Sequence, residues 1–483
     1  MSSFLDRVRE TEAIRKQLGR QGSLTLVYGQ RRTGKTFLLQ HVAGRDADAI
    51  YFLADETSSP DLLRRFLVQA GAWTRAGSGL SPTGITDWGT ALALLFQEAH
   101  VARRRLVLVI DECQYLLDRE PALPSILQRL WDQFLGRARV HVLLCGSALG
   151  TLSKLGEGSQ PLHGRFDLKL HLDPFSFRES ALFVPRWTAI EKLRLYGVFG
   201  GLARHLAAVD PGKSLERNVC EAILEPLSPL HEAPQDMLRA ERVSSTAEAA
   251  AVVEAVASGE NRFNAIASRT GLKASRLDYV VKELMELDIV EKEVRFGDKP
   301  GSKLVRYRCR DPFVEFWFRF VGPNRSALQS APPESVWRQR ILPGFDSHMG
   351  SVFERLVAAA LRAGLLADRL GPADEVAPFW SRDGQTQIDA VARFGRRLLF
   401  VECKWRSGSK AGTRVLDRLR EHAAHLPGAA AREPATYCVA SARAFSSGLR
   451  KAAAREGVIL LDGRDLLAAR PAAGSLRPDA PLR

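Results

Sequence analysis

The chain has 483 residues, of which 45% are hydrophobic and 26% charged, and it carries a formal net charge of +14. It is too long for one core, so we expect about two to four domains, and it contains no apolar run near the roughly 20 residues that cross a bilayer. A membrane protein is therefore excluded, and a cytoplasmic globular protein is expected. Six scattered cysteines with no C-x-x-C pair indicate buried free thiols and not a disulfide framework or a zinc site.

Residues 1–175 alternate between strand-like and helix-like patterns. Strands are predicted at 24–28, 49–53, 106–111, 140–145 and 168–172, with helices between them, for example at 92–99 and 122–135. Such βαβ alternation is typical of a parallel sheet that is covered by helices on both faces.

A glycine-rich loop follows the first strand. Residues 29–36 read Gly-Gln-Arg-Arg-Thr-Gly-Lys-Thr, a full match to G-x-x-x-x-G-K-[ST] between a strand and a helix. Backbone N–H groups of such a loop bind phosphate oxygens, its lysine reaches the β- and γ-phosphates, and its last hydroxyl binds Mg²⁺. We therefore expect ATP and Mg²⁺ as cofactors, held by Gly29, Gln30, Arg31, Arg32, Thr33, Gly34, Lys35 and Thr36.

Four further residues complete a predicted ATP-hydrolysing site. The strand at 106–111 ends in Asp111-Glu112, and we expect Asp111 to bind Mg²⁺ with Thr36 and Glu112 to orient the attacking water. Ser147 follows the next strand and could contact the γ-phosphate or the water, or could be a plain turn residue. Arg165 is a candidate to stabilise charge on the transferred phosphoryl group, and the sequence supports a surface ion pair equally well.

The middle of the chain changes character. Residues 176–240 show helical patterns only and predict a helical lid. Helices at 247–257, 263–269 and 275–287 and strands at 289–295 and 303–309 then predict a winged helix-turn-helix, followed by an aromatic cluster and a Pro- and Ser-rich linker. DNA contact is expected from the basic residues on or near the third helix and in the wing, although such modules also serve as lids or protein contacts. These basic residues are Lys273, Arg276, Lys282, Arg295, Lys299 and Lys303.

The last predicted domain contains a second group of charged residues. A helix is predicted at 351–363, a hairpin from strands 387–394 and 398–405, and further strands at 437–440 and 458–461. Glu402 and Lys404 share one strand face because they are two residues apart, and the hairpin and helix can bring Asp389 and Glu354 beside them. Carboxylates so gathered bind Mg²⁺ and activate water, so Glu354, Asp389 and Glu402 are expected metal ligands and catalytic residues, with Lys404 orienting the water.

This D…ExK pattern resembles the PD-(D/E)xK nuclease fold, and a domain retained only for binding DNA or protein is the alternative.

A second set of motifs runs through the first half of the chain. It consists of Phe4-Leu5-Asp6-Arg7 with Glu10, the loop 29–36, and the segments 108–112, 145–147, 162–165, 172–179 and 196–201. Together these motifs resemble the archaeal-type AAA+/STAND ATPases. The resemblance implies a winged helix after the ATPase, an Asp-Pro-Phe…Phe-Trp-Phe signature at 311–318 and a restriction-endonuclease-like C-terminal domain.

The expected fold class is α/β, a P-loop NTPase sheet with a helical lid, a winged helix-turn-helix and a restriction-endonuclease-like domain. The expected boundaries are 1–175 for the ATPase core, 176–240 for the lid, 241–321 for the winged helix, 322–344 for a linker, 345–470 for the nuclease-like domain and 471–483 for a disordered tail. The expected function is an ATPase coupled to a DNA-binding, Mg²⁺-dependent DNA-cleaving domain. The alternative is a signalling or DNA-remodelling ATPase without nuclease activity.

The expected partner is DNA, because the basic excess favours a polyanion. An arginine-rich proteome would give the same excess. A second copy of the chain or another protein is a further candidate partner, and no membrane contact is expected.

Overall fold

The computed structural model describes residues 7–44, 46–74, 84–134, 138–147, 152–158, 160–241, 243–299, 301–405, 410–426 and 434–468. The expected tail at 471–483 and the motif residues Phe4, Leu5 and Asp6 lie outside them. The chain divides into two compact units, an N-terminal unit of Met1–Phe175 with Leu202–Arg204, and a C-terminal unit of Ser176–Gly201 with His205–Arg483.

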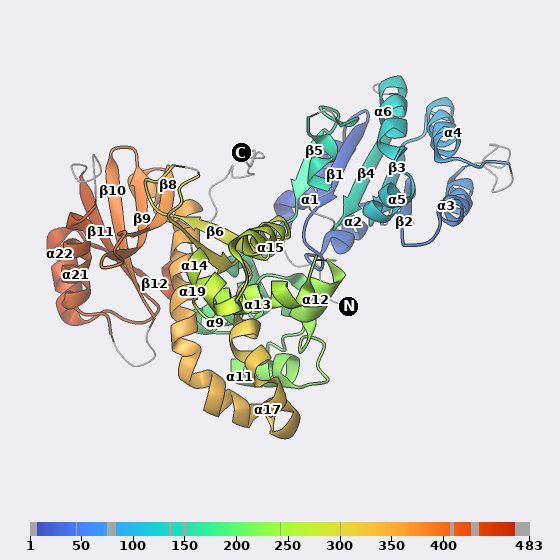
Figure 1. Cartoon of the computed structure of the whole chain (residues 1–483). Coiled ribbons are helices and arrows are strands. Elements are labelled where there is room, and N and C mark those ends of the chain that lie inside the picture. The colour runs from blue at the N-terminus through green and yellow to red at the C-terminus, as the bar shows by residue number, and fades with distance from the viewer. Residues whose placement is uncertain are drawn as a thin grey trace. The chain divides into compact units, whose positions relative to one another are not determined.

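The N-terminal unit contains a five-stranded sheet in the order β2-β3-β4-β1-β5, in which every neighbouring pair is parallel (Figure 1). Its strands are β1 Ser23–Tyr28, β2 Ala49–Leu53, β3 Leu106–Asp111, β4 Val140–Gly146 and β5 Leu168–His171. The predicted parallel α/β sheet is therefore confirmed, with strand ends within one residue of those expected. Its helices are α1 Val8–Leu18, α2 Lys35–Ala43, α3 Ser59–Trp73, α4 Trp88–Val101, α5 Cys113–Arg119 and α6 Leu123–Phe134, with the short helix η1 Ser153–Gly156.

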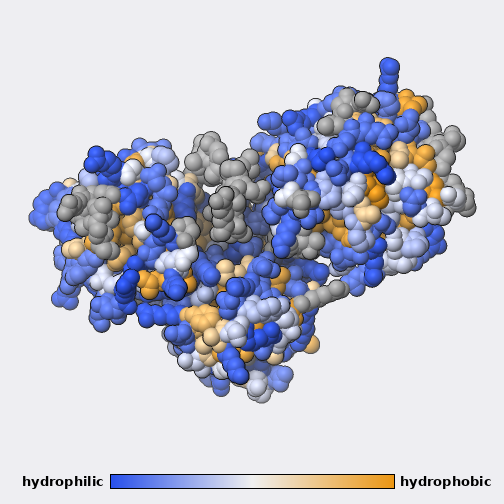
Figure 2. Space-filling view, turned by 45° about the horizontal axis from the view of Figure 1, so that its top comes forward, coloured by the Kyte–Doolittle hydropathy of each residue, from blue (hydrophilic) through white to orange (hydrophobic). Residues whose placement is uncertain are grey.

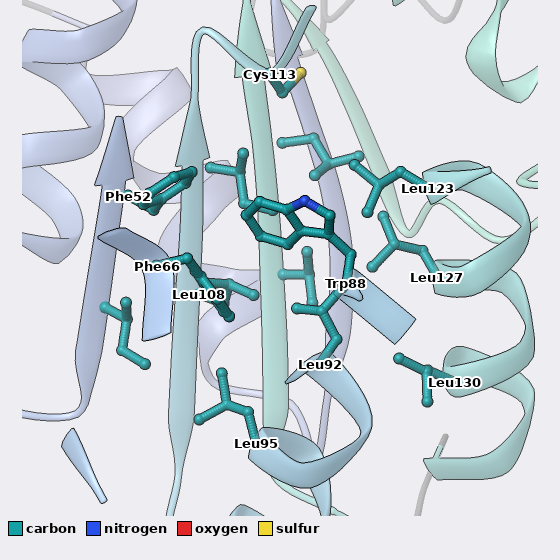
Figure 3. Close-up of a cluster of buried hydrophobic side chains, with 14 of the residues drawn as sticks. Phe52, Phe66, Trp88, Leu92, Leu95, Leu108, Cys113, Leu123, Leu127 and Leu130 are labelled. Atoms are coloured by element: carbon teal, nitrogen blue, oxygen red, sulfur yellow. The ribbon is translucent and has the colours of Figure 1, made fainter. Parts of the chain in front are cut away.

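Both faces of this sheet are buried, which explains why its strands read as continuous apolar runs. Alternate residues of β3 point to opposite faces, so that Leu106, Leu108 and Ile110 pack in one core, and Val107 and Val109 in another. Helices α3, α4 and α6 cover the first face, where the Trp88 ring packs against Phe52 and Phe66 (Figure 3). Helices α1 and α2 cover the second face.

The C-terminal unit begins with helices that the sequence assigned to a lid. They are α8 Phe177–Ser180, η2 Ala181–Phe183, α9 Ala189–Phe199, α10 Ala203–Ala207, α11 Leu215–Val219, η3 Cys220–Leu224 and α12 Ala233–Ala240. Helix α9 packs on the later helix α19 (Leu342–Arg362) so closely that a Cβ on Gly197 would lie 2.5 Å from the Met349 sulfur. Apart from Leu202–Arg204, the predicted lid thus belongs by its packing to the C-terminal unit.

Three helices and a hairpin follow where a winged helix-turn-helix was predicted. They are α13 Thr246–Ala257, α14 Phe263–Thr270, α15 Ala274–Glu286 and the antiparallel strands β6 Val290–Val294 and β7 Val305–Cys309. Gly271 ends α14 in the left-handed region at φ 71°, which glycine adopts without strain. The assignment as a winged helix stays a prediction.

The predicted linker at 322–344 is wrong, because this stretch is helical. It follows directly on α16 Pro312–Phe316 and η4 Trp317–Val321, and its helices are η5 Gly322–Asn324, α17 Arg325–Ser330, α18 Pro333–Val336, η6 Trp337–Ile341 and the start of α19. Pro323, Pro333 and Pro343 lie in the first turns of η5, α18 and α19, where a missing N–H costs nothing. Trp337 and Ile341 are buried, so these helices form part of the core.

The last part of the C-terminal unit is a mixed sheet in the order β12-β11-β10-β9-β8. Its strands are β8 Glu375–Trp380, β9 Gln387–Phe394, β10 Arg397–Lys404, β11 Ala435–Ser441 and β12 Ile459–Asp462, with helices α20 Ala367–Leu370, α21 Thr413–Ala424, α22 Ser447–Glu456 and α23 Gly463–Ala468. Strands β8, β9 and β10 are antiparallel neighbours, whereas β10, β11 and β12 are parallel. The predicted hairpin of β9 and β10 is confirmed.

A buried polar network joins the parts of the C-terminal unit. Arg355 on α19 binds the Glu315 carboxylate on α16 at 2.6 Å and donates to the Cys309 carbonyl at 3.0 Å, and His348 bonds the Gly197 carbonyl at 2.8 Å. Burial lowers the pKa of His348 to about 4, so it is neutral at physiological pH. These bonds tie α9, the hairpin and α19 into one structure.

Hydrophilic residues predominate on the face shown in Figure 2, with smaller hydrophobic patches between them. Among the described residues, we find no helix whose length and apolar character would let it cross a bilayer.

Candidate functional site

Strand order places the candidate phosphate loop and the acidic pair at one edge of the N-terminal sheet. All five strands run in the same direction, so the segments after β1, β3 and β4 leave the sheet at its carboxyl edge. Strand β4 lies between β1 and β3, so Ser147 lies between the loop 29–36 and Asp111-Glu112. The structure thus brings these predicted residues together.

The loop wraps back on itself. Gly29 has φ 156°, and a Cβ there would lie 2.5 Å from the Leu172 carbonyl oxygen, so only glycine fits. Gly34, at φ 98°, precedes the first residue of α2, whose N-terminal N–H groups face the loop. The Lys35 ammonium is buried and donates to the carbonyls of Gly29 at 2.8 Å and Gln30 at 2.9 Å. It lies inside the loop, where a phosphate group would be bound.

The other loop residues are held by local bonds. The Thr33 hydroxyl donates to the Gln30 carbonyl at 2.9 Å, and Arg31 donates to the Tyr115 hydroxyl at 3.2 Å. Arg32 takes the left-handed conformation at φ 70°. These local bonds help to fix the conformation of the loop.

Arg7 contacts the loop and holds it in place. The sequence places Arg7 in a motif, but the motif alone did not predict this contact. Its guanidinium donates to the carbonyls of Thr33 at 3.3 Å and Asp173 at 2.7 Å, and lies 4.1 Å from the centre of the Phe175 ring. Arg7 therefore connects the phosphate loop to the segment after β5.

The acidic pair has two different environments. The Asp111 side chain is buried and accepts the Tyr51 hydroxyl at 2.6 Å and the Glu112 N–H at 2.9 Å. Burial, and then the Asp111 carboxylate, raise the pKa of Tyr51, so its hydroxyl stays protonated. An exposed Thr36 hydroxyl and a carboxylate are oxygen ligands of the kind Mg²⁺ prefers, so Thr36 and Asp111 fit the expected ion.

Glu112 is oriented by two neighbours. It takes the left-handed conformation at φ 51°, and its Oε2 accepts from Gln114 Nε2 at 2.5 Å and from the Ser147 hydroxyl at 3.1 Å. Gln114 also accepts the Ser147 N–H at 3.3 Å. A Cβ on Gly146 would lie 2.1 Å from the Gln114 side-chain oxygen, so a larger residue there would displace the Gln114 side chain from this position.

A second cluster lies in the C-terminal unit, where β9, β10 and α19 bring Asp389, Glu402, Lys404 and Glu354 together. Asp389 accepts the Cys403 N–H at 2.7 Å, and Lys404 donates to Glu402 at 2.5 Å. Burial, and then the Asp389 carboxylate, raise the pKa of Glu354. Burial, and then the Glu402 carboxylate, raise the pKa of Asp389. The carboxylates are therefore close enough to oppose one another's ionisation.

The expected set of three metal ligands here is not assembled. Among the residues that the structure describes, no three His, Cys, Asp or Glu side chains are grouped so as to hold a metal ion. The reason is that Glu402 is turned onto the Lys404 ammonium and Asp389 onto the backbone N–H of Cys403. Metal binding by Glu354, Asp389 and Glu402 together would require these bonds to rearrange.

Comparison with known proteins supports the assignment of the first site. Residues 4–209 match the family described as an ATPase domain predominantly from Archaea. This part of the chain is therefore similar to archaeal-type ATPase domains. Residues 317–416 match a second family, described as archaeal and bacterial proteins of unknown function. Neither description names a nuclease, and the predicted nuclease fold stays a prediction.

Two relatives come from Methanocaldococcus jannaschii. The uncharacterized protein MJECL04 is 26% identical over 412 residues, which cover 83% of this chain and 88% of the relative. The uncharacterized protein MJ0424 is 36% identical over 80 residues, or 17% of this chain and 68% of the relative.

Two solved structures are also similar. The Walker-type ATPase PABY2304 of Pyrococcus abyssi is 19% identical, with 65% of this chain and 96% of that chain covered at a TM-score of 0.49. The ORC2 protein of Aeropyrum pernix, in ADPNP–ADP complexes, is 17% identical, with 68% of this chain and 98% of that chain covered at a TM-score of 0.45. Similarity at this level assigns no ligand or partner to the chain.

Arg165 of the ATPase domain is not brought to the phosphate loop. Its guanidinium makes two bonds to the Asp132 carboxylate, at 2.9 and 2.8 Å, and one to the Pro161 carbonyl. Asp167, two residues on, accepts the Leu24 N–H at the beginning of β1, so Arg165 lies near the amino edge of the sheet, opposite the loop. The surface ion pair is what the structure contains, so a role at the phosphate loop of the same chain is not supported, and a role in a neighbouring subunit stays a prediction.

The hairpin β6–β7 packs on the mixed sheet. Phe296 lies in the core with Phe379 and Ile388, and its N–H donates to the Pro378 carbonyl at 2.8 Å. Arg295, expected to contact DNA, bonds Asp298 at 2.8 Å with both side chains largely buried. On α15 and its neighbour, Arg276 pairs with Glu248 and Lys282 with Asp278. These three cations already have partners, so they do not support the predicted DNA contact.

Proposed function

We propose that the ATPase domain binds ATP with Mg²⁺ and hydrolyses its terminal phosphate. The observation that carries this proposal is the arrangement of the loop 29–36, Asp111 and Glu112 at one sheet edge. Lys35 and the loop N–H groups would bind the phosphates, and Thr36 and Asp111 would hold Mg²⁺, which neutralises charge on the transferred group. Glu112, fixed by Gln114 and Ser147, would orient and polarise the attacking water.

Phosphate release from purified full-length protein tests this proposal. We expect steady hydrolysis of ATP with Mg²⁺, and none when EDTA removes the ion. Calorimetry with ATP at millimolar concentration provides the independent measurement. If no nucleotide binds under these conditions, the proposal is wrong.

A second activity is favoured by the carboxylate cluster. Burial and neighbouring carboxylates raise the pKa values of Glu354 and Asp389, which lie beside Glu402 and Lys404, and burying carboxylate charge is costly unless a ligand or a proton neutralises it. We propose that this cluster binds Mg²⁺ when Glu402 and Asp389 give up their bonds to Lys404 and the Cys403 N–H, and that it then cleaves DNA, which the net charge of +14 would attract. Metal binding requires that the carboxyl groups of Glu354 and Asp389 lose their protons, and their pKa values are raised, so DNA cleavage should increase with pH across neutrality.

Substitution of Glu402 tests this second activity. Glu402→Gln keeps the shape of the side chain but removes a metal-binding charge, and we expect strand breaks to fall by roughly 10²-fold or more. Glu421→Gln, on the exposed face of α21, is the matched control and should cleave as the wild type does. DNA of several forms would be incubated with Mg²⁺ and resolved on gels.

The same assay distinguishes the alternatives. If the wild type makes no breaks but its ATPase rate rises with added DNA, the chain is a DNA-remodelling ATPase. If neither occurs, a signalling ATPase that binds partners through its C-terminal unit is the better proposal. If Lys35→Ala leaves strand breaks unchanged, the two units act independently and the proposed coupling between them is wrong.

A further inference from the structure

The Tyr51 hydroxyl lies between the two side chains that would hold Mg²⁺. Tyr51 is on β2, paired with Val109 of β3, and Asp111 is two residues further along the same strand. Residues two apart share a face, so Tyr51 and Asp111 project to the side covered by α2. Helix α2 begins at Lys35 and carries Thr36 in its first turn. Three elements therefore meet at this hydroxyl.

The hydrogen bonds run in one direction. The Tyr51 hydroxyl donates to Asp111 Oδ2 at 2.6 Å, and the Thr36 side chain acts on Tyr51 as a hydrogen-bond donor, which partly opposes the rise in the pKa of Tyr51. A threonine hydroxyl that donates its proton keeps the lone pairs of its oxygen available to a cation. The other oxygen of Asp111, Oδ1, accepts the Glu112 N–H at 2.9 Å. These hydrogen bonds thus orient Thr36 and Asp111, the two expected ligands, and leave oxygen lone pairs on both side chains for a metal ion.

Packing keeps the Tyr51 ring in place. The ring is half-buried against the core that includes Ala43, Val107 and Val109, so the position of the hydroxyl is set by apolar contacts. A tyrosine on a half-buried strand is common, but its hydroxyl normally reaches water. Here the hydroxyl instead has two partners, and both are predicted metal ligands.

We propose that Tyr51 is a positioning residue of the magnesium site, which orients Asp111 and Thr36 for the ion. The inference rests on the proposed ATPase function. Groups that hydrogen-bond to metal ligands change metal affinity by about 10–100-fold when they are removed. Tyr51 would therefore control how much Mg²⁺ the nucleotide complex needs, while the nucleotide itself is held by the loop.

Tyr51→Phe tests the inference because it removes only the hydroxyl. Calorimetry would measure ADP binding in EDTA and at a series of Mg²⁺ concentrations. We expect ADP affinity in EDTA to match the wild type, the melting temperature to fall by a few degrees because the buried Asp111 carboxylate loses a donor, and the Mg²⁺ concentration for half-maximal tightening to rise about 10–100-fold. Tyr437→Phe, on β11 of the C-terminal unit, makes the same chemical change away from the site and should have no effect.

A second variant tests whether Tyr51 acts through Asp111. Asp111→Asn should itself raise the Mg²⁺ requirement, and adding Tyr51→Phe to it should produce less than the sum of the two effects. An unchanged Mg²⁺ requirement in Tyr51→Phe, or an equal loss of affinity with and without Mg²⁺, would overturn the inference. If the wild type binds no nucleotide, the proposed function fails before the variants are compared, so the two failures are distinguishable.

Discussion

Lys35→Ala is expected to lower ATP affinity by about 10²–10⁴-fold, since a charge-assisted hydrogen bond contributes roughly 1.5–3 kcal/mol and Lys35 can make two to the phosphates. The ammonium now donates to two loop carbonyls, and on binding it would exchange these for phosphate oxygens. Phosphate release should therefore be lost at micromolar ATP. Calorimetry gives the affinity, and a phosphate assay gives the rate.

The matched control for this variant is Lys154→Ala. Lys154 is exposed on η1 of the same unit, so its removal changes the net charge equally and leaves the loop intact. Melting temperatures of both variants would show whether the loop carbonyls need the buried ammonium for stability. Wild-type affinity in a folded Lys35→Ala protein would show that phosphate is bound elsewhere.

Local patterns predicted the N-terminal sheet well because its strands are buried on both faces. Runs such as 49–53 and 106–111 have few polar residues and clear ends, and the structure has strands with these bounds. The glycine-rich loop is also local, because its conformation is set by glycines at fixed positions. These features depend little on the rest of the chain.

Residues that orient the site could not be found in this way. Tyr51 acts on Asp111 because β2 pairs with β3, and Gln114 contacts Ser147 because β4 lies beside β3. Strand order is a long-range property that no short pattern reveals. The one local signal was Gln114 directly after the acidic pair, a polar side chain at a position that proved to be buried.

Proline residues lie at two places where the prediction and the structure differ. Strand β8 was not predicted, and it contains Pro378, which is tolerated because β8 is an edge strand of its sheet, where a missing N–H costs little. The Pro378 carbonyl instead accepts the Phe296 N–H of the hairpin. The stretch 322–344 was assigned to a linker because it is rich in Pro and Ser, although its prolines begin helices.

Glu112→Gln is the variant that separates binding from chemistry. The amide oxygen can still accept from Ser147 and Gln114, so the side chain should keep its position, but it can no longer take a proton or polarise water as a carboxylate does. We expect ATP affinity to change little and the hydrolysis rate to fall by about 10²–10⁴-fold, the usual contribution of a positioned base.

Single-turnover hydrolysis with enzyme in excess would measure this step without product release. Glu157→Gln, an exposed residue of the same unit, removes the same charge away from the site and should hydrolyse ATP at the wild-type rate. A variant that binds ATP and does not hydrolyse it would also hold the nucleotide-bound state. If Glu112→Gln instead hydrolysed ATP normally, the attacking water would have to be oriented by another group, and the bonds from Gln114 and Ser147 would serve only to neutralise a half-buried carboxylate.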